Sequence, residues 1–114
     1  MSFLTDNSKT YLRELVRQGL NDLEAFGYQK IVVDGTVQSL TIPTDAKIAV
    51  MSLVSTITSG PAVWVRYDAN PATGGGQPFY NGDRWNVVDA KNLVNFKITQ
   101  DSAGTHTLYI EYYR

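Results

Sequence analysis

Two hydrophobic periodicities divide the chain. Within residues 8 to 26, apolar side chains recur at steps of three and four positions. That spacing places them along one face of an α-helix. From Gln29 onward, apolar and polar residues alternate instead, as they do in β-strands. The pattern therefore predicts an N-terminal amphipathic helical segment over residues 1–28 and a β-domain over residues 29–114.

The alternating part predicts short antiparallel strands separated by turn residues. The run Ala46–Thr58 has apolar residues on both faces, so we expect it at the centre of the core. Asp34-Gly35 suits a tight hairpin between two strands, and Leu93–Thr99 alternates like a further strand. In the last strand, the residues predicted to face inward are Leu108, Ile110 and Tyr112. The expected fold is mainly β within the α+β class: the helix, then an antiparallel β-sandwich of about seven to eight strands.

Composition narrows the class of partner. The chain has 114 residues and a mass of 12.7 kDa, which suits one core. Ten basic and eleven acidic residues give a formal net charge of −1, and no basic stripe is present to bind phosphates. We therefore expect no nucleic-acid partner.

There is no cysteine to form disulfides or thiolate metal sites. Neither a signal peptide nor a membrane-spanning run is found, which predicts a soluble protein made in the cytosol.

Residues able to carry catalysis or bind metal are sparse in the sequence. His106 stands alone between two threonines, and we expect it on the surface rather than in a catalytic site. Asp68, Asn70, Asp83 and Asp89 could surround a calcium ion, but their spacing matches no EF-hand loop. Asp and Asn are also common in turns, which is the preferred interpretation. The sequence predicts no catalytic, cofactor-binding or metal-binding residue.

Aromatic residues between positions 64 and 85 form a candidate ligand surface. A sugar ring could stack on such side chains while neighbouring Asp and Asn side chains bond its hydroxyls. The same residues equally fit a core or a contact between subunits. The candidate ligand surface consists of Trp64, Tyr80 and Trp85.

The apolar stripe of the predicted helix forms a candidate interface. One face of an amphipathic helix must be covered, either by its own sandwich or by another subunit. Together with the aromatic strands, the stripe predicts a homo-oligomer, expected as a trimer. The candidate interface consists of Leu12, Leu15, Val16, Leu23 and Phe26.

From Thr36 onward, the order of strand and turn signals carries a family resemblance. The features, in chain order, are Leu40-Thr41-Ile42-Pro43, Val65-Arg66-Tyr67-Asp68, Pro71-Ala72-Thr73 with the glycines that follow, Asn81-Gly82-Asp83, Phe96-Lys97-Ile98 and Leu108–Arg114. In this order they resemble small proteins encoded among the virion genes of tailed bacteriophages, over about 75 to 80 residues of strand and turn pattern.

The resemblance implies a compact β-sandwich that assembles on the phage particle as a head-decoration, head-fibre or neck component. It implies no catalytic residues, and the predicted helix lies outside it. The expected function is a non-catalytic virion structural protein, an auxiliary or decoration subunit of the head. Its expected partners are copies of itself and other virion proteins such as the major capsid protein. The alternative is a glycan-binding module of a phage adsorption apparatus.

Overall fold

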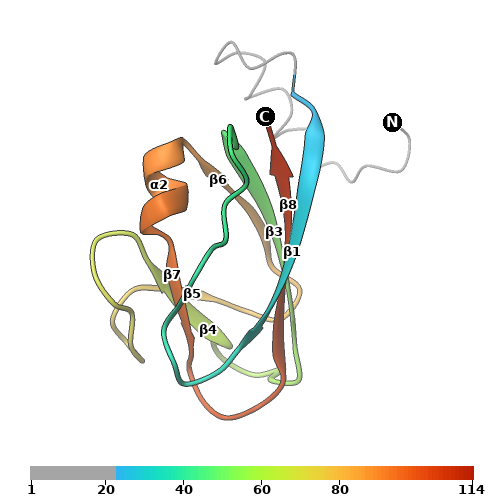
Figure 1. The fold of residues 1–114 in the computed structure, drawn as a ribbon. Helices are drawn as coiled ribbons and strands as arrows, with labels where there is room; N and C mark the ends of the chain where they lie inside the picture. The colour runs from blue at the N-terminus through green and yellow to red at the C-terminus, as the bar shows by residue number, and fades with distance from the viewer. Residues whose placement is uncertain (1–22) are drawn as a thin grey trace.

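The computed structural model describes residues 23–114, which form two antiparallel four-stranded sheets and one short helix (Figure 1). Sheet A has the strand order β1-β8-β3-β6. Its strands are β1 (Ala25–Val33), β8 (His106–Tyr113), β3 (Ile48–Ser55) and β6 (Arg84–Val88). Sheet B has the order β2-β7-β4-β5. Its strands are β2 (Gln38–Ser39), β7 (Lys97–Gln100), β4 (Val63–Arg66) and β5 (Gln77–Phe79). The helix α2 (Ala90–Asn95) joins β6 to β7.

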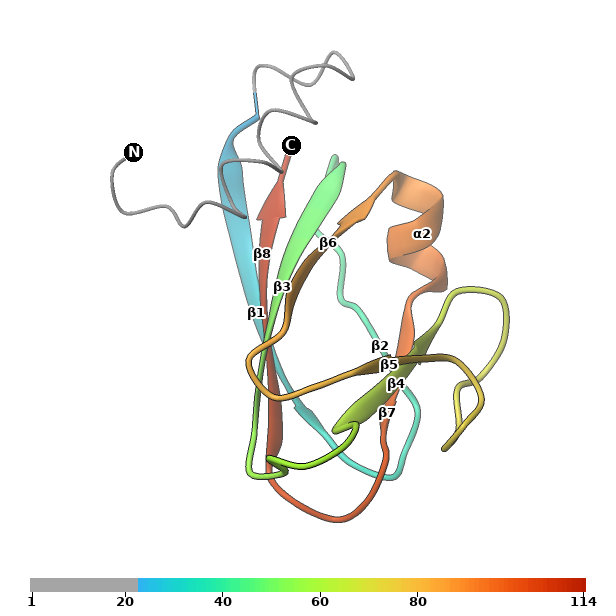
Figure 2. The same cartoon turned by 180° about the vertical axis from the view of Figure 1, so that it is seen from behind.

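One face of each sheet contributes to a shared core between the two layers, which Figure 2 shows side by side. In β8, Leu108, Ile110 and Tyr112 are fully buried, which confirms the inward positions that alternation predicted. β3 lies between β8 and β6, and its Met51 and Leu53 are fully buried in the same core. The long apolar run is therefore central, as expected, and the arrangement is that of a β-sandwich.

The first strand begins earlier than the sequence predicted. Glu24 and Arg114 exchange backbone hydrogen bonds of 3.1 and 3.0 Å, so the pairing of β1 with β8 extends to this end. Phe26 packs against the core, and the Arg114 guanidinium lies 4.8 Å from the centre of its ring. Residues 25–28 thus belong to the β-domain, and the prediction of a helix as far as Phe26 is wrong. The rest of that helix prediction, residues 8–22, lies outside the described residues.

Asp34-Gly35 does not form the predicted hairpin. The strands on either side of it lie in different sheets, because β1 pairs with β8 and β2 pairs with β7. Asp34 Oδ1 accepts a hydrogen bond of 2.8 Å from the Thr36 backbone N–H, and the Asp34 carbonyl accepts one of 3.0 Å from Gln100. The pair is therefore a corner that carries the chain from one layer to the other. Pairing with distant strands outweighs the local turn preference.

The predicted strand over Leu93–Thr99 is partly a helix. Asp89, at a φ of 86°, caps α2 by accepting a hydrogen bond of 3.1 Å from the Lys91 backbone N–H. Leu93 is fully buried, whereas its neighbour Val94 is 65% exposed. The extended strand starts only at Lys97. A short alternating run fits one turn of helix as well as a strand, and here the helix cap decides the outcome.

Candidate functional site on the outer face of sheet A

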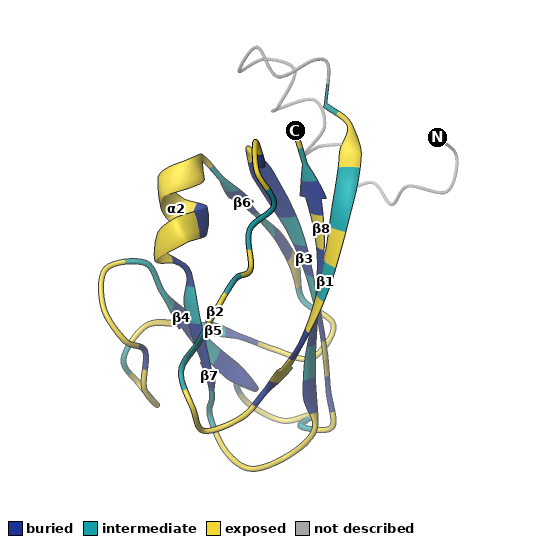
Figure 3. Ribbon diagram, in the orientation of Figure 1, coloured by how far each residue is buried: buried dark blue, intermediate teal, exposed yellow. Residues whose placement is uncertain are grey.

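Large exposed hydrophobic side chains gather on the face of sheet A that points away from sheet B. Of the six such side chains among residues 23–114, four lie there: Tyr28, Val32, Val54 and Tyr109. Val32 and Val54 flank Thr107 in one row across β1, β8 and β3. Figure 3 shows that more exposed and more buried residues alternate along β1. Exposed apolar groups that gather on one face, rather than scatter, are typical of a binding surface.

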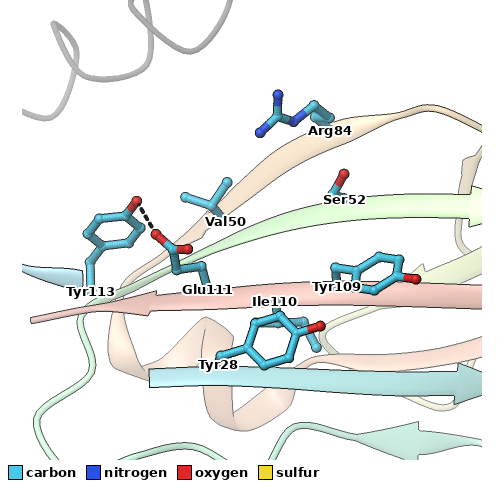
Figure 4. Close-up of a pocket in the computed structure, with 8 residues that line it drawn as sticks. All are labelled: Tyr28, Val50, Ser52, Arg84, Tyr109, Ile110, Glu111 and Tyr113. Carbon is cyan, nitrogen blue, oxygen red and sulfur yellow. Dashed lines mark hydrogen bonds between the residues drawn. The ribbon is translucent and has the colours of Figure 1, made fainter. Parts of the chain in front are cut away.

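A hollow of about 170 Å³ lies on this outer face, and all four strands line it (Figure 4). The register places Ser52 of β3 between Tyr109 of β8 and Arg84 of β6. On β8, Glu111 lies between two neighbouring strands: Tyr28 of β1 is on one side, and β3 is on the other. The other residues that line it are Val50, Ile110 and Tyr113. Because the lining comes from paired strands rather than loops, the hollow is part of the rigid sheet.

A hydrogen bond inside the hollow holds its carboxylate. The Tyr113 hydroxyl donates to Glu111 Oε1 at 2.7 Å. Burial, then the hydrogen bond and the charge of Glu111, raise the pKa of Tyr113 to about 12, while Arg84 lowers it. The phenol is therefore protonated at neutral pH and remains a donor. Glu111 is exposed and fixed in place, so the hollow presents a positioned acceptor beside aromatic rings.

The three aromatic residues that the sequence grouped as a ligand surface are separated in the structure. Trp85 is only 8% exposed and stacks on Phe79, with 3.7 Å between ring centres and an interplanar angle of 12°. Trp64 is on sheet B, where its indole N–H donates to Asp101 Oδ1 at 2.7 Å. Tyr80, 45% exposed, follows β5. Trp85 is a core residue, so the three do not form one sugar platform.

His106 is fully buried rather than exposed, which corrects the surface location expected from the sequence. Its Nδ1 lies 2.8 Å from Ser55 Oγ, and its Nε2 lies 2.8 Å from the Ser102 carbonyl oxygen. Both ring nitrogens thus bond to neighbouring strands and loops. The residue joins β3 to β8 and has a structural part in the fold.

The acidic residues considered for calcium have separate local roles. Asp68 pairs with Arg66 at 2.9 Å, and the hydrogen bond from that guanidinium lowers the pKa of Asp68. Asp83 Oδ2 accepts from the Tyr80 backbone N–H at 2.8 Å, and Asp89 caps α2. Within residues 23–114 no group of three or more His, Cys, Asp or Glu side chains is placed to hold a metal ion. The turn interpretation is confirmed for Asp83.

Only part of the candidate interface lies among the residues that the structure describes. Leu23 is half-buried immediately before β1, and Phe26 is half-buried against the core. Leu12, Leu15 and Val16 lie outside the described residues, and their role as a contact stays a prediction. Phe26 is better explained as part of the sandwich.

Sequence reasoning missed the residues that line the hollow. A signal was present in the last strand, where Tyr109, Glu111 and Tyr113 alternate with the inward positions and so share the outer face. Tyr28 and Arg84 come from strands far away in the chain, and only the register brings them to the same place. That pairing is not visible in the sequence.

In the described part of the chain, no helix has the length and apolar character needed to cross a membrane. Comparison with protein-family models, with curated proteins and with solved structures finds no match to this chain.

Proposed function

We propose that the chain is a non-catalytic structural subunit of a tailed-bacteriophage particle, attached to the head as an auxiliary or decoration protein. The observation that carries the proposal is that, within residues 23–114, the buried core cluster takes its members from both sheets. Sheets A and B thus cover each other's apolar faces. In this proposal, the apolar N-terminal positions Leu12, Leu15 and Val16 contact another subunit instead of completing the core.

The resemblance from Thr36 onward supports the same assignment, because small virion proteins of tailed phages share this order of strands and turns. The proposed site of action is the virion. The proposed partners are further copies of the chain, in a trimer, and other virion proteins such as the major capsid protein. No cofactor, nucleic acid or membrane takes part in the proposed role.

The test uses the phage that encodes the chain, grown from a genome in which its gene is deleted. Purified protein is added back to these particles, and binding is measured by co-sedimentation and by density in electron cryomicroscopy. We expect wild-type protein to saturate at a fixed number of copies per particle. Light scattering of the free protein should show more than one chain. Failure of the wild-type protein to bind the depleted particles would contradict the proposal.

A substitution on the N-terminal stripe separates an interface from a core position. Leu15→Asp places an uncompensated charge in a buried contact, which costs several kcal/mol wherever that contact lies. We expect this variant to melt like the wild type but to lose particle binding. Gln18→Asp, on the polar side of the same stretch, is the matched control and should bind normally. A lowered melting temperature for Leu15→Asp would instead place Leu15 in the chain's own core.

A further inference from the structure

Two exposed aromatic rings line the hollow on the outer face of sheet A. Tyr28 is 64% exposed and Tyr109 is 36% exposed. They are diagonal neighbours on adjacent strands, because Tyr28 pairs with Glu111, two positions beyond Tyr109. Diagonal neighbours lie roughly 7–8 Å apart, within the reach of aromatic side chains. Each ring offers an apolar face and a hydroxyl that can bond.

A carboxylate, a guanidinium and a hydroxyl group also line the hollow, and each can form hydrogen bonds. Glu111 uses Oε1 to accept from Tyr113, and its Oε2 has no hydrogen-bond partner within residues 23–114. Arg84 and the Ser52 hydroxyl lie opposite each other on β6 and β3, on the other side of the hollow (Figure 4). One side of the hollow therefore offers an acceptor and the other side offers donors.

We propose that this hollow binds a neutral sugar unit, a hexopyranose within an oligo- or polysaccharide. A pyranose has a face of C–H groups, which packs on Tyr28 and Tyr109, and a rim of hydroxyls. Those hydroxyls donate to Glu111 and accept from Arg84, because a hydroxyl can do both. The inference rests on the hollow alone and is independent of the proposed place of the chain on a phage particle.

The charges of the hollow select the class of ligand. One carboxylate and one guanidinium line the hollow, so its lining carries no net charge; Glu111 repels an anionic ligand and Arg84 repels a cationic one. A neutral polyol meets neither penalty. The hollow is also open along the face of the sheet, so a polysaccharide can continue beyond the bound ring. Strand-borne side chains need little ordering on binding, which favours a weak but specific site.

The test is an amide NMR titration of the full chain with maltohexaose, cellohexaose, laminarihexaose and β-1,4-mannohexaose. We expect at least one of them to cause saturable shifts centred on Tyr109 and Glu111. Tyr109→Ala should weaken that binding about tenfold, because the stacked ring is lost. Glu111→Gln should also weaken it about tenfold, because a charged acceptor becomes neutral. Tyr80→Ala removes an exposed tyrosine outside the hollow and should bind like the wild type.

Melting curves of the variants separate loss of the site from loss of the fold, since all three side chains point to solvent. The absence of saturable shifts with every neutral oligosaccharide overturns the proposal. Equal affinity of Tyr109→Ala and wild type also overturns it. Binding of heparin or chitosan oligomers without binding of the neutral sugars would reject the neutral class. Self-association that Tyr109→Ala abolishes, in a protein that binds no sugar, would assign the face to a protein contact.

Discussion

Removing His106 tests how β3 and β8 are joined at one end of sheet A. The ring is fully buried between Ser55 Oγ and the Ser102 carbonyl, at 2.8 Å from each. A carbonyl oxygen only accepts, so Nε2 carries a proton, and in the neutral imidazole Nδ1 then accepts from the Ser55 hydroxyl. Ser55 Oγ in turn accepts from the Ile57 backbone N–H at 2.9 Å. The bonds form one chain in which every donor has an acceptor.

The substitution His106→Leu replaces the ring with an apolar side chain of similar size and removes both ring bonds. The Ser55 O–H then has no acceptor, although its oxygen still accepts from Ile57, and the Ser102 carbonyl has no donor. Each unsatisfied buried group costs about 1–3 kcal/mol. Ser102 is exposed, so water can replace part of its loss. We therefore expect the free energy of unfolding to fall by about 2–3 kcal/mol. An unfolding entropy of about 0.2 kcal/mol/K for a domain of this size converts that loss to about 10–15 °C in Tm.

Urea denaturation and calorimetry measure the loss, and a double-mutant cycle locates its cause. Ser55→Ala alone should cost less than His106→Leu, because the ring still bonds to Ser102. The double variant should cost less than the sum of the single variants, since neither partner is then left alone. Wild-type stability of His106→Leu, or strict additivity within about 0.3–0.5 kcal/mol, would refute the reasoning. So would ring nitrogen NMR that finds the proton on Nδ1.

Three further predictions follow from single positions. Gly76→Ala should lower the free energy of unfolding by about 2–3 kcal/mol, and Gly74→Ala by only about 1 kcal/mol. A Cβ on Gly76 (φ +149°) would lie 2.8 Å from a backbone oxygen of β4, whereas a Cβ on Gly74 (φ +74°) would meet nothing within 4 Å. Equal shifts in thermal melts would contradict this. Tyr113 should titrate near pH 12 in ultraviolet absorbance, and Glu111→Gln should lower that pKa because the acceptor of its hydrogen bond loses its charge. Because the pKa of Tyr113 in the folded chain lies above the ordinary 10.0, this tyrosine ionises first in the unfolded chain. Stability should therefore fall as the pH rises from 10.0 through about 12. An unchanged titration of Tyr113 in Glu111→Gln would count against the contact between the two side chains. Leu108→Ala, at a fully buried position in the central strand, should cost about 2–5 kcal/mol in urea unfolding, and a loss below about 1 would contradict its place in the core.

The parts of the fold that depend on local alternation could be predicted from the sequence. Leu108, Ile110 and Tyr112 are inward because side chains on a strand alternate between faces whatever the strand pairs with. Pairing itself is a global outcome. Asp34-Gly35 has the composition of a hairpin turn, yet the strands beside it find better partners elsewhere. The extent of β1 depended in the same way on the backbone of β8, which is more than half the chain away.

The site was harder to predict than the fold for the same reason. Tyr80 and Trp85 are close together in the sequence, but Tyr80 is exposed and Trp85 is buried in the core, because a turn and a change of face separate them. Tyr28 and Tyr109 are distant in the sequence but meet through the register of β1 and β8. His106 was misjudged because its partners, a serine on β3 and a carbonyl in a loop, are visible only in three dimensions.

The central position of β8 in sheet A sets a condition on how the chain is made in the cell. β1 and β3 are synthesised long before β8, and in the finished sheet both bond to it rather than to each other. While the ribosome is still adding the later residues, β1 has no native partner strand and β3 can pair only with β6, so the edges of β1 and β3 that bond to β8 are unpaired. Sheet A therefore forms after β8 leaves the exit tunnel, in a step dominated by contacts distant in sequence and correspondingly slow. During that interval the unpaired edges of β1 and β3 are available for pairing with strands of other chains.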